Sequence, residues 1–344
     1  MPPPPPWRTE LAQSLREPAA LLAALGLSAE QFGGERIAPP RPGQSPGAPL
    51  PQTHRNTFPF RVPRGYVARM QRADLRDPLL RQVLPTAEED TESPGYSDDP
   101  LAEGAARRVP GVLQKYRGRV LLITTAACAI HCRYCFRRHF AYGESGLSGR
   151  GLNTALAWIG REQSIREVIL SGGDPLCLDD GRLAELAERI ARIPHVQYLR
   201  VHTRLPIVLP ARVCGPLVSW LTGTRLRPVV VVHANHPNEI DGQVKAALAR
   251  LRGEGITLLN QSVLLRGVND DADTLANLSE RLFAAGALPY YLHLLDPVTG
   301  AQHFAVTAQR ASQIMAELRA RLPGYLVPRP VREVAGAEYK IPLA

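Results

Sequence analysis

The stretch VLLITTAACAIHCRYC, residues 120–135, decides the fold, because a short apolar run is followed at once by three closely spaced cysteines. Residues 120–124 are typical of a buried strand. Similar runs follow along the chain at 167–170, 198–202, 229–233, 257–263 and 290–294. Helical patterns lie between them, at 180–192, 239–252 and 273–285. Strands that alternate with helices indicate parallel βαβ units and a buried sheet.

Six strand–helix units are too few for a closed eightfold barrel, so the sequence leaves an open barrel and a doubly wound sheet as alternatives. In both, the chemistry belongs at the carboxyl ends of the strands. Polar residues stand at all six expected strand ends, at Cys128, 171–175, 202–204, 233–236, 260–262 and Asp296. We therefore expect a functional site along this edge of the sheet.

The composition fits a globular protein with a sizeable core, since 44% of the 344 residues are apolar. The formal net charge of +9 suits an acidic protein partner or a nucleic acid, or is simply a basic surface. No apolar run is long enough to span a membrane, and residues 1–7 do not resemble a signal peptide. Five cysteines, three of them within eight residues, favour a metal site in a reducing cytoplasm over a disulfide framework.

We expect three parts along the chain: an N-terminal helical or irregular extension over 1–105, a strand–helix core over 106–300 and a C-terminal segment over 301–344. Within the extension, 11–27 is typical of an amphipathic helix and 74–84 of a loop that enters a short helix. Six prolines and two glycines make 39–51 a linker.

The cysteine spacing, three residues and then two, indicates one small inorganic centre, with Cys128, Cys132 and Cys135 as its ligands. Three thiolates on a four-iron cluster leave one iron open to a small molecule. A zinc site completed by His131 or His139, or chance spacing, is the alternative. Cys177 and Cys214 lie far from the motif and are more typical of small buried residues.

Three cysteines with this spacing after a first strand resemble the signature of the radical S-adenosylmethionine (radical SAM) superfamily. The resemblance implies that the amine and carboxylate of SAM chelate the open iron. Glycines allow a close backbone approach to a ligand, although a plain strand-to-helix turn explains them equally well. The further cofactor-binding residues that we expect at the strand ends are Gly172, Gly173, Asp174 and His233.

The resemblance extends to the lysine 2,3-aminomutase family, through the stretches 132–139, 171–176, 233–240, 260–270 and 289–291. It covers roughly residues 57–342 and implies a partial (β/α)6 barrel with an N-terminal helical extension and a short C-terminal segment that binds pyridoxal phosphate (PLP). The implied enzyme is an isomerase that converts L-lysine to (R)-β-lysine, using a [4Fe-4S] cluster, SAM and PLP. A branch that supplies β-lysine for modification of elongation factor P shares the stretches 77–84, 135–140, 204–212 and 324–328.

Position within the resemblance selects Lys340 as the catalytic lysine that binds PLP, rather than Lys115 or Lys245. Many relatives have a glycine run before this lysine, whereas residues 336–339 are Gly-Ala-Glu-Tyr here. Arg119 is expected to hold the PLP phosphate, although a surface arginine at a strand start is the plain alternative. Gln261 is expected near PLP or SAM.

Three residues are expected to bind the substrate. Arg137 would pair with the substrate carboxylate, because a guanidinium matches two oxygens; balancing charge beside the cysteines is the competing role. Asp296 and Glu333 would hold the distal ammonium of lysine, since an unpaired ion in a dry pocket is costly. Lysine-specific relatives commonly have aspartate at both positions, so Glu333 is one methylene longer.

The resemblance also implies partners: free L-lysine as substrate, a flavodoxin or ferredoxin as reductant, and a pathway link to elongation factor P and its lysyl ligase. We expect a cytoplasmic enzyme with no membrane and no nucleic acid as partner. Three other hypotheses stay open: an aminomutase for another pathway or amino acid, a radical SAM enzyme that modifies RNA, and a non-enzymatic zinc module.

Overall fold

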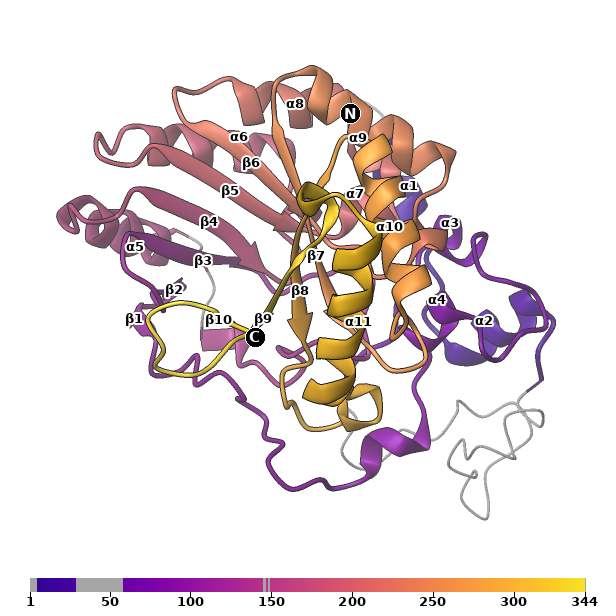
Figure 1. Cartoon of the computed structure of the whole chain (residues 1–344). Coiled ribbons are helices and arrows are strands. Elements are labelled where there is room, and N and C mark those ends of the chain that lie inside the picture. Colours follow the sequence, from indigo (N-terminus) through magenta and orange to yellow (C-terminus); the bar gives the residue numbers. More distant parts are fainter. Residues whose placement is uncertain (1–4, 29–57, 145–146, 148, 344) are drawn as a thin grey trace, which may run out of the picture.

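The computed structural model describes residues 5–28, 58–144, 147 and 149–343, and a ten-stranded sheet forms its centre (Figure 1). Six neighbouring strands run parallel in the order of the sequence. They are β3 Arg119–Thr125, β4 Glu167–Gly172, β5 Tyr198–Thr203, β6 Arg227–Val232, β7 Thr257–Leu264 and β8 Leu288–Leu294. These strands coincide with the six apolar runs of the sequence, which confirms the expected strands.

Helices connect these strands and lie around the sheet (Figure 1). The longer ones are α5 Arg150–Arg161, α6 Asp180–Ala191, α8 Gly215–Thr222, α9 Gly242–Gly253, α10 Ala272–Ala284 and α11 Ala308–Arg321. Because the strand order never reverses, right-handed crossovers place these helices on one face of the sheet. The doubly wound alternative is therefore wrong, and the fold is a partial (β/α)6 barrel.

Short strands extend the sheet at both edges. Strands β1 Arg107–Val109 and β2 Val112–Leu113 lie beside β3. Strand β9 Arg329–Arg332 runs parallel to β8, and β10 Ile341–Pro342 pairs with β9. Lys340, which directly precedes β10, is thereby brought back to the sheet.

The N-terminal part contains short helices, so the single helix expected over 11–27 is wrong. The structure has α1 Pro6–Ala12 and α2 Pro18–Leu25 instead. Glu17 is extended because the residue before a proline disfavours helical backbone, and Pro18 starts the second helix. The other short helices are α3 Arg64–Val67, α4 Pro78–Arg81 and α7 Leu205–Val208. Helix α4 confirms the loop-to-helix prediction for 74–84, while the linker at 39–51 lies outside the described residues.

Short 3-10 helices form many of the remaining turns, and these are η1 Ala87–Asp90, η2 Tyr142–Glu144, η3 Pro175–Cys177, η4 Pro210–Arg212, η5 Pro237–Glu239, η6 Gln302–Phe304 and η7 Gly324–Leu326. None of the helices in the described ranges is long and apolar enough to cross a membrane.

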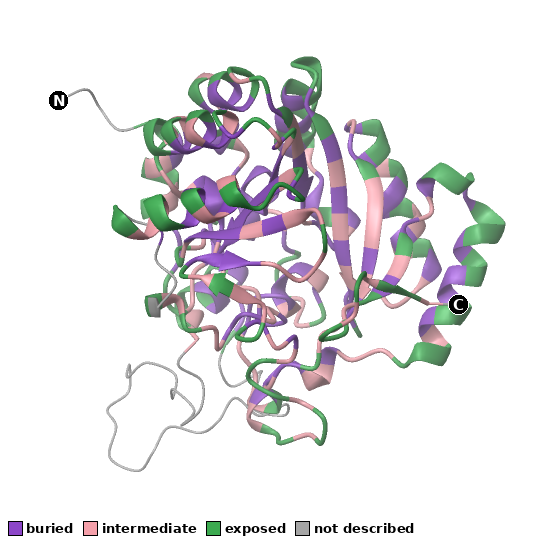
Figure 2. Cartoon of the chain, turned by 90° about the vertical axis from the view of Figure 1, so that its left-hand side faces the viewer, coloured by how far each residue is buried: buried purple, intermediate pink, exposed green. Residues whose placement is uncertain are grey.

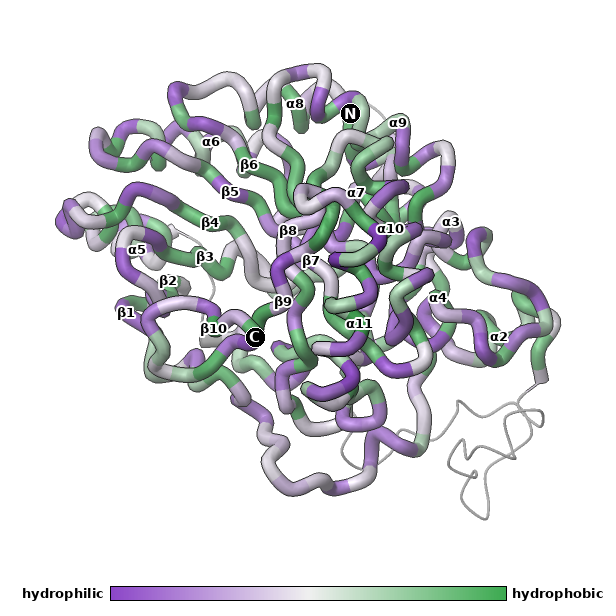
Figure 3. Tube along the Cα trace, in the orientation of Figure 1, coloured by the Kyte–Doolittle hydropathy of each residue, from purple (hydrophilic) through white to green (hydrophobic). Residues whose placement is uncertain are grey.

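The core lies between the strands and the helices, where buried residues gather (Figure 2) and apolar stretches follow the strands (Figure 3). In β5, Leu199 and Val201 belong to this core, whereas Arg200 and His202 alternate with them on the opposite face. A parallel strand is usually apolar on both faces. The polar inner face therefore marks the side on which the functional residues collect.

Candidate active site

The three cysteines of the motif lie in the loop that follows β3 (residues 126–141, the cysteine loop), and all three are free thiols. Burial raises the pKa of Cys128, and it raises the pKa of Cys135 to about 11. Nearby cysteines add to both rises, since Cys135 acts on Cys128 and Cys132 acts on Cys135. Within the described ranges, no three His, Cys, Asp or Glu side chains lie close enough together to hold a single metal ion. The donor set fits a metal centre, because bound metal stabilises the thiolates that burial disfavours.

The two glycines after β4 let the backbone lie directly on the cysteine loop. Gly173 donates its N–H to the carbonyl of Thr125 at 2.7 Å. A Cβ on Gly172 would lie 2.5 Å from the carbonyl oxygen of Thr125, and one on Gly173 would lie 2.4 Å from that of Ala127. Gly172 also has a φ of +122°, which side chains rarely adopt. The glycines thus have a role in positioning Cys128, and their proposed contact with a cofactor stays a prediction.

Asp174 joins two strand ends through bonds within the protein. Its carboxylate accepts the Thr203 hydroxyl and the Arg204 N–H, each at 2.7 Å, and also the N–H groups of Leu176 and Leu205. Burial raises the pKa of Asp174 to about 6, although these hydrogen bonds oppose the rise. The residue therefore fixes the end of β5 against that of β4; its expected role in cofactor binding stays a prediction.

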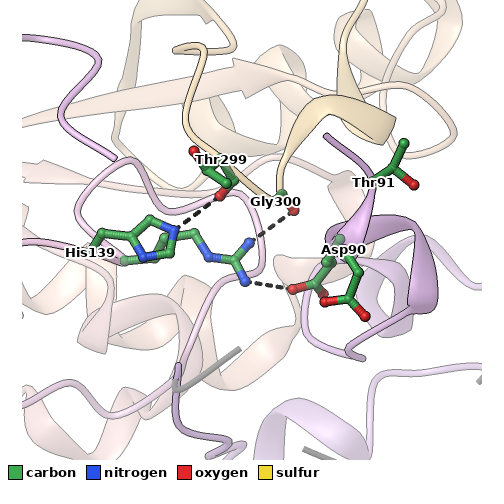
Figure 4. Close-up of a pocket in the computed structure, with 7 residues that line it drawn as sticks. Asp90, Thr91, His139, Thr299 and Gly300 are labelled. Atoms are coloured by element: carbon green, nitrogen blue, oxygen red, sulfur yellow. Dashed lines mark hydrogen bonds and ion pairs between the residues drawn. The ribbon is translucent and has the colours of Figure 1, made fainter. Parts of the chain in front are cut away.

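A second anchor holds the cysteine loop from the N-terminal side, around the buried carboxylate of Glu89 in η1, beside the pocket that Figure 4 shows. Glu89 accepts two hydrogen bonds from Arg133 and one from Arg138. Arg138 Nη1 also donates to the carbonyl of Gly300 at 2.9 Å. A Cβ added to Gly300 would lie 2.8 Å from the same nitrogen, so only glycine leaves room for this contact. The narrow pocket beside these contacts is lined partly by the same residues, so we assign it to the support of the loop.

Five charged side chains from distant parts of the sequence form one continuous network. Glu103 accepts two hydrogen bonds from Arg137, at Nε (2.7 Å) and Nη2 (2.8 Å). Lys115 Nζ lies 3.0 Å from Glu103 and 2.7 Å from Glu333. The other oxygen of Glu333 accepts a hydrogen bond from Lys340. The signs alternate along the network, so each charge has an opposite neighbour.

The carboxylates expected to bind an ammonium have opposite pKa shifts. Burial raises the pKa of Asp296 to about 7, and the nearby Glu333 adds to the rise. Burial also acts on Glu333, but Lys340 and Lys115 lower its pKa well below the usual range. Glu333 is therefore ionised at neutral pH, whereas Asp296 is divided between its two forms.

Two polar groups near the start of β3 fit an anion. Arg119 Nε and the Tyr116 hydroxyl are buried, and neither has a hydrogen-bond partner among the residues that the structure describes. The Arg119 guanidinium lies 4.8 Å from the centre of the Tyr116 ring. Buried donors are normally satisfied. Both groups can donate to a phosphate, and the expected role of Arg119 in holding the PLP phosphate stays a prediction.

His233 directly follows β6, and Gln261 lies on the neighbouring strand β7. The His233 ring stacks on Tyr134 at 5.8 Å, and its Nε2 lies 3.2 Å from the Tyr134 hydroxyl. Burial, aided by Arg204, lowers the pKa of His233 to about 3, so the ring is neutral. Gln261 is half-buried on β7. Their expected roles beside a cofactor stay predictions.

Three residues that the structure brings into the site carried no assigned role from the sequence: Glu103, Lys115 and Arg204. Arg204 was expected only as one of the polar residues at a strand end, and Lys115 was set aside as a candidate for the lysine that binds PLP, although a site lysine stands out when lysine is so rare in the chain. Arg204 Nη1 lies 2.6 Å from the sulfur of Cys132. Glu103 carries no sequence signal of its own, because only its distance to Arg137 reveals its role.

The other two cysteines are less buried than the sequence suggested. Cys177 and Cys214 are half-buried and pack against the apolar core. Lys245 is exposed on α9.

Comparisons with known proteins agree with this geometry. The sequence pattern of the Radical SAM superfamily matches residues 122–278. L-lysine 2,3-aminomutase of Escherichia coli (strain K12) is 46% identical over 98% of this chain and 94% of that protein. The Haemophilus influenzae enzyme of the same name is 44% identical over 97% and 94%, and that of Clostridium subterminale 36% identical over 81% and 67%. A solved radical SAM methyltransferase from Sphaerobacter thermophilus aligns over 64% of this chain and 68% of its own, with a TM-score of 0.42 and 22% identity, and adds nothing to the assignment.

The partial barrel, the cysteine loop and the matching pattern define a radical SAM enzyme. More particularly, the chain belongs to the L-lysine 2,3-aminomutase family. It is an isomerase that works with a [4Fe-4S] cluster, SAM and PLP. Membership of this family excludes the non-enzymatic zinc module and the RNA-modifying enzyme.

Proposed function

We propose that this enzyme converts L-lysine to (R)-β-lysine by moving the amino group from Cα to Cβ. The observation that carries the proposal is the distribution of charge in the site. The buried Arg137 guanidinium stands at one end, and Glu333 and Asp296 stand at the other. This pattern is complementary to a substrate with a carboxylate at one end and an ammonium at the other.

The cluster and SAM supply the radical that removes hydrogen from Cβ, and PLP supplies the π system through which the nitrogen moves. We assign Cys128, Cys132 and Cys135 to the cluster and Lys340 to PLP. Further cofactor contacts are proposed for Arg119, Gln261, Gly172, Gly173, Asp174 and His233. The buried thiols and the unpartnered donors at Arg119 support these assignments.

Glu103 orients the proposed carboxylate site. It binds the Nε and Nη2 of Arg137, while the Ser171 hydroxyl accepts from Nη1 at 3.1 Å. Nη1 also donates to the carbonyl of Gly172 at 3.4 Å, so of the five N–H groups of the guanidinium one, on Nη2, remains for the substrate. Arg137 therefore sits in a fixed plane before the substrate arrives, which lowers the cost of ordering it.

The two ion pairs of Glu333, with Lys115 and with Lys340, support a distal site for an alkylammonium group. A Lys340 that holds PLP no longer offers its ammonium to Glu333. The substrate ammonium can then take that place beside Asp296. An aminomutase for an acidic amino acid is the alternative, and these carboxylates disfavour it by repulsion.

We infer further that the enzyme is of the EpmB type and supplies β-lysine for modification of elongation factor P. The shared stretches 77–84, 135–140, 204–212 and 324–328 support this role. A flavodoxin or ferredoxin is proposed as reductant, and the +9 net charge suits such an acidic protein. A cytoplasmic location, with the lysyl ligase of elongation factor P acting after this enzyme, completes the proposal; neither a membrane nor a nucleic acid is a proposed partner.

The test is anaerobic reconstitution with iron, sulfide and PLP, followed by incubation with SAM, dithionite and L-lysine. We expect (R)-β-lysine by chromatography of the derivatised product, and no product from L-glutamate. Lys340→Ala should lose both the visible PLP absorbance and the activity, whereas Lys245→Ala, on an exposed helix face, should keep both. A fully loaded wild-type enzyme that leaves L-lysine unchanged would overturn the proposal.

A further inference from the structure

Arg204, at the end of β5, touches the sulfur of a proposed cluster ligand. Its Nη1 lies 2.6 Å from Sγ of Cys132, which is within hydrogen-bond distance. By contrast, the Arg61 side chain donates to the backbone oxygen of Cys128, at 3.0 Å. We infer that Arg204 raises the reduction potential of the iron–sulfur cluster through a charged N–H···S hydrogen bond to Cys132. This inference rests on the ligands assigned under the proposed function.

The guanidinium of Arg204 is fixed by its surroundings. The residue is only 7% exposed, and its Nη2 donates to Gln82 (2.8 Å), Glu239 (2.9 Å) and the Tyr66 hydroxyl (3.2 Å). The rings of Tyr66 and Tyr134 lie 5.5 and 5.7 Å from its central carbon. A side chain held on so many sides cannot turn away from the sulfur at low cost.

The backbone of Arg204 is fixed relative to the cysteine loop as well. Asp174 accepts the Arg204 N–H at 2.7 Å, and its own N–H donates to the carbonyl of Ala127, next to Cys128, at 2.8 Å. The same residue therefore positions both the arginine and the loop that carries the sulfur. The short contact follows from the architecture of the strand ends, rather than from a freely chosen rotamer.

The local charge balance gives the direction of the effect. A guanidinium stays protonated in proteins, so Arg204 carries a positive charge beside the sulfur of Cys132 and the carboxylate of Glu239. Glu239 neutralises this permanent cation only in part, because the arginine also lies beside the Cys132 thiolate. One-electron uptake makes a cluster more negative, and a nearby cation with a hydrogen bond to sulfur stabilises that form. The electron comes from the external reductant.

The proposal explains why an arginine occupies this position. A purely structural partner for Glu239 would not need to reach the sulfur, whereas Nη1 does so while Nη2 holds the carboxylate. Hydrogen bonds to ligand sulfurs are among the protein's means of setting cluster potentials. Arg204 is thus a positioning residue whose charge makes the cluster easier to reduce before SAM is cleaved.

The test is a potentiometric titration of the reconstituted cluster, followed by electron paramagnetic resonance. The variant Arg204→Met combined with Glu239→Gln removes the cation without leaving a buried carboxylate unpaired. We expect its equilibrium constant for reduction to fall at least tenfold, which is 59 mV for one electron. Iron and sulfide analysis of each protein verifies that the cluster is present.

Two single variants complete the design. Tyr66→Phe removes a partner of Nη2 but leaves the contact with sulfur, so its potential should equal that of the wild type. Arg204→Lys keeps the positive charge but loses the two-pronged guanidinium, so we expect its reduction potential to fall by less than that of the double variant. If the double variant assembles no cluster, Arg204→Lys decides the question. Equal potentials in wild type and every loaded Arg204 variant would overturn the inference alone. A wild type that forms no cluster would instead overturn the proposed function.

Discussion

Lys115 shows how a single residue sets the chemistry of the distal ammonium site. Its Nζ lies between Glu103 and Glu333, and so links the proposed carboxylate site to the proposed ammonium site. Lys115 occupies one oxygen of Glu333 and leaves the other to Lys340. For Asp296, in contrast, burial and the nearby Glu333 raise the pKa to about 7, close to neutral pH. The two carboxylates are therefore unequal, and only Asp296 titrates in the physiological range.

At the residue scale we predict that kcat/KM for L-lysine rises with pH and levels off above about 7. Asp296 is neutral below its pKa of about 7 and becomes a carboxylate above it, when it can bind an ammonium. Asp296→Asn should remove this acidic limb and raise KM about 10- to 100-fold, as expected for a charged hydrogen bond of about 1.5–3 kcal/mol. Glu317→Gln, on the exposed face of α11, serves as the control and should keep the wild-type profile. An unchanged acidic limb in Asp296→Asn would show that another group titrates.

At the scale of elements, the turn after β4 controls how the cysteine loop leaves β3. Parallel pairing of β3 and β4 continues to the Thr125–Gly172 pair. Gly172 and Gly173 then lie so close to the backbone of the cysteine loop that a side chain would not fit between them. Asp174 completes the arrangement by bonding the end of β5. The Ser-Gly-Gly-Asp stretch thus fixes the ends of β3, β4 and β5 relative to one another, which places Cys128 and Arg204 in the same site.

We predict that Gly173→Ala displaces the cysteine loop, because its Cβ would lie 2.4 Å from the carbonyl oxygen of Ala127. The strain should cost about 1–3 kcal/mol of unfolding free energy and reduce the iron bound per chain. Gly181→Ala in α6 is the matched control, since no atom lies within 4 Å of its added Cβ. That variant should be neutral or more stable by up to about 1 kcal/mol. Denaturant unfolding and iron analysis compare them, and equal iron content in both would contradict the assigned role.

Across the whole molecule, the N- and C-terminal parts are joined to the barrel rather than appended to it. Trp7 and Leu21 belong to the same apolar core as strands β3 to β7. Strands β9 and β10 extend the sheet beyond β8. Glu89 connects η1 to two arginines of the cysteine loop. The boundaries at 105 and 300 stay a prediction, but the contacts across them are extensive.

We predict that Glu89→Gln destabilises the protein by about 3–5 kcal/mol, because it removes the carboxylate that balances Arg133 and Arg138 in a buried site. Glu88→Gln, one residue earlier and exposed, should change the stability by less than about 0.5 kcal/mol. Thermal unfolding of the two variants side by side is the measurement. If both unfold at the wild-type temperature, the carboxylate does not anchor the loop.

The sequence by itself determined the order of strands and helices and the cysteine motif, since periodicity and motif spacing are local properties that survive without a structure. The choice of Lys340 came from the family resemblance and stays a prediction. It failed locally over 11–27, where Pro18 outweighed the apolar pattern. Only the tertiary structure decided which charges meet. Lys115 and Glu333 are 218 positions apart, and Arg204 is 72 positions from Cys132. Such pairs come together because the parallel strands align their ends at one edge of the sheet, and no local pattern records which of many arginines will face a given sulfur or carboxylate.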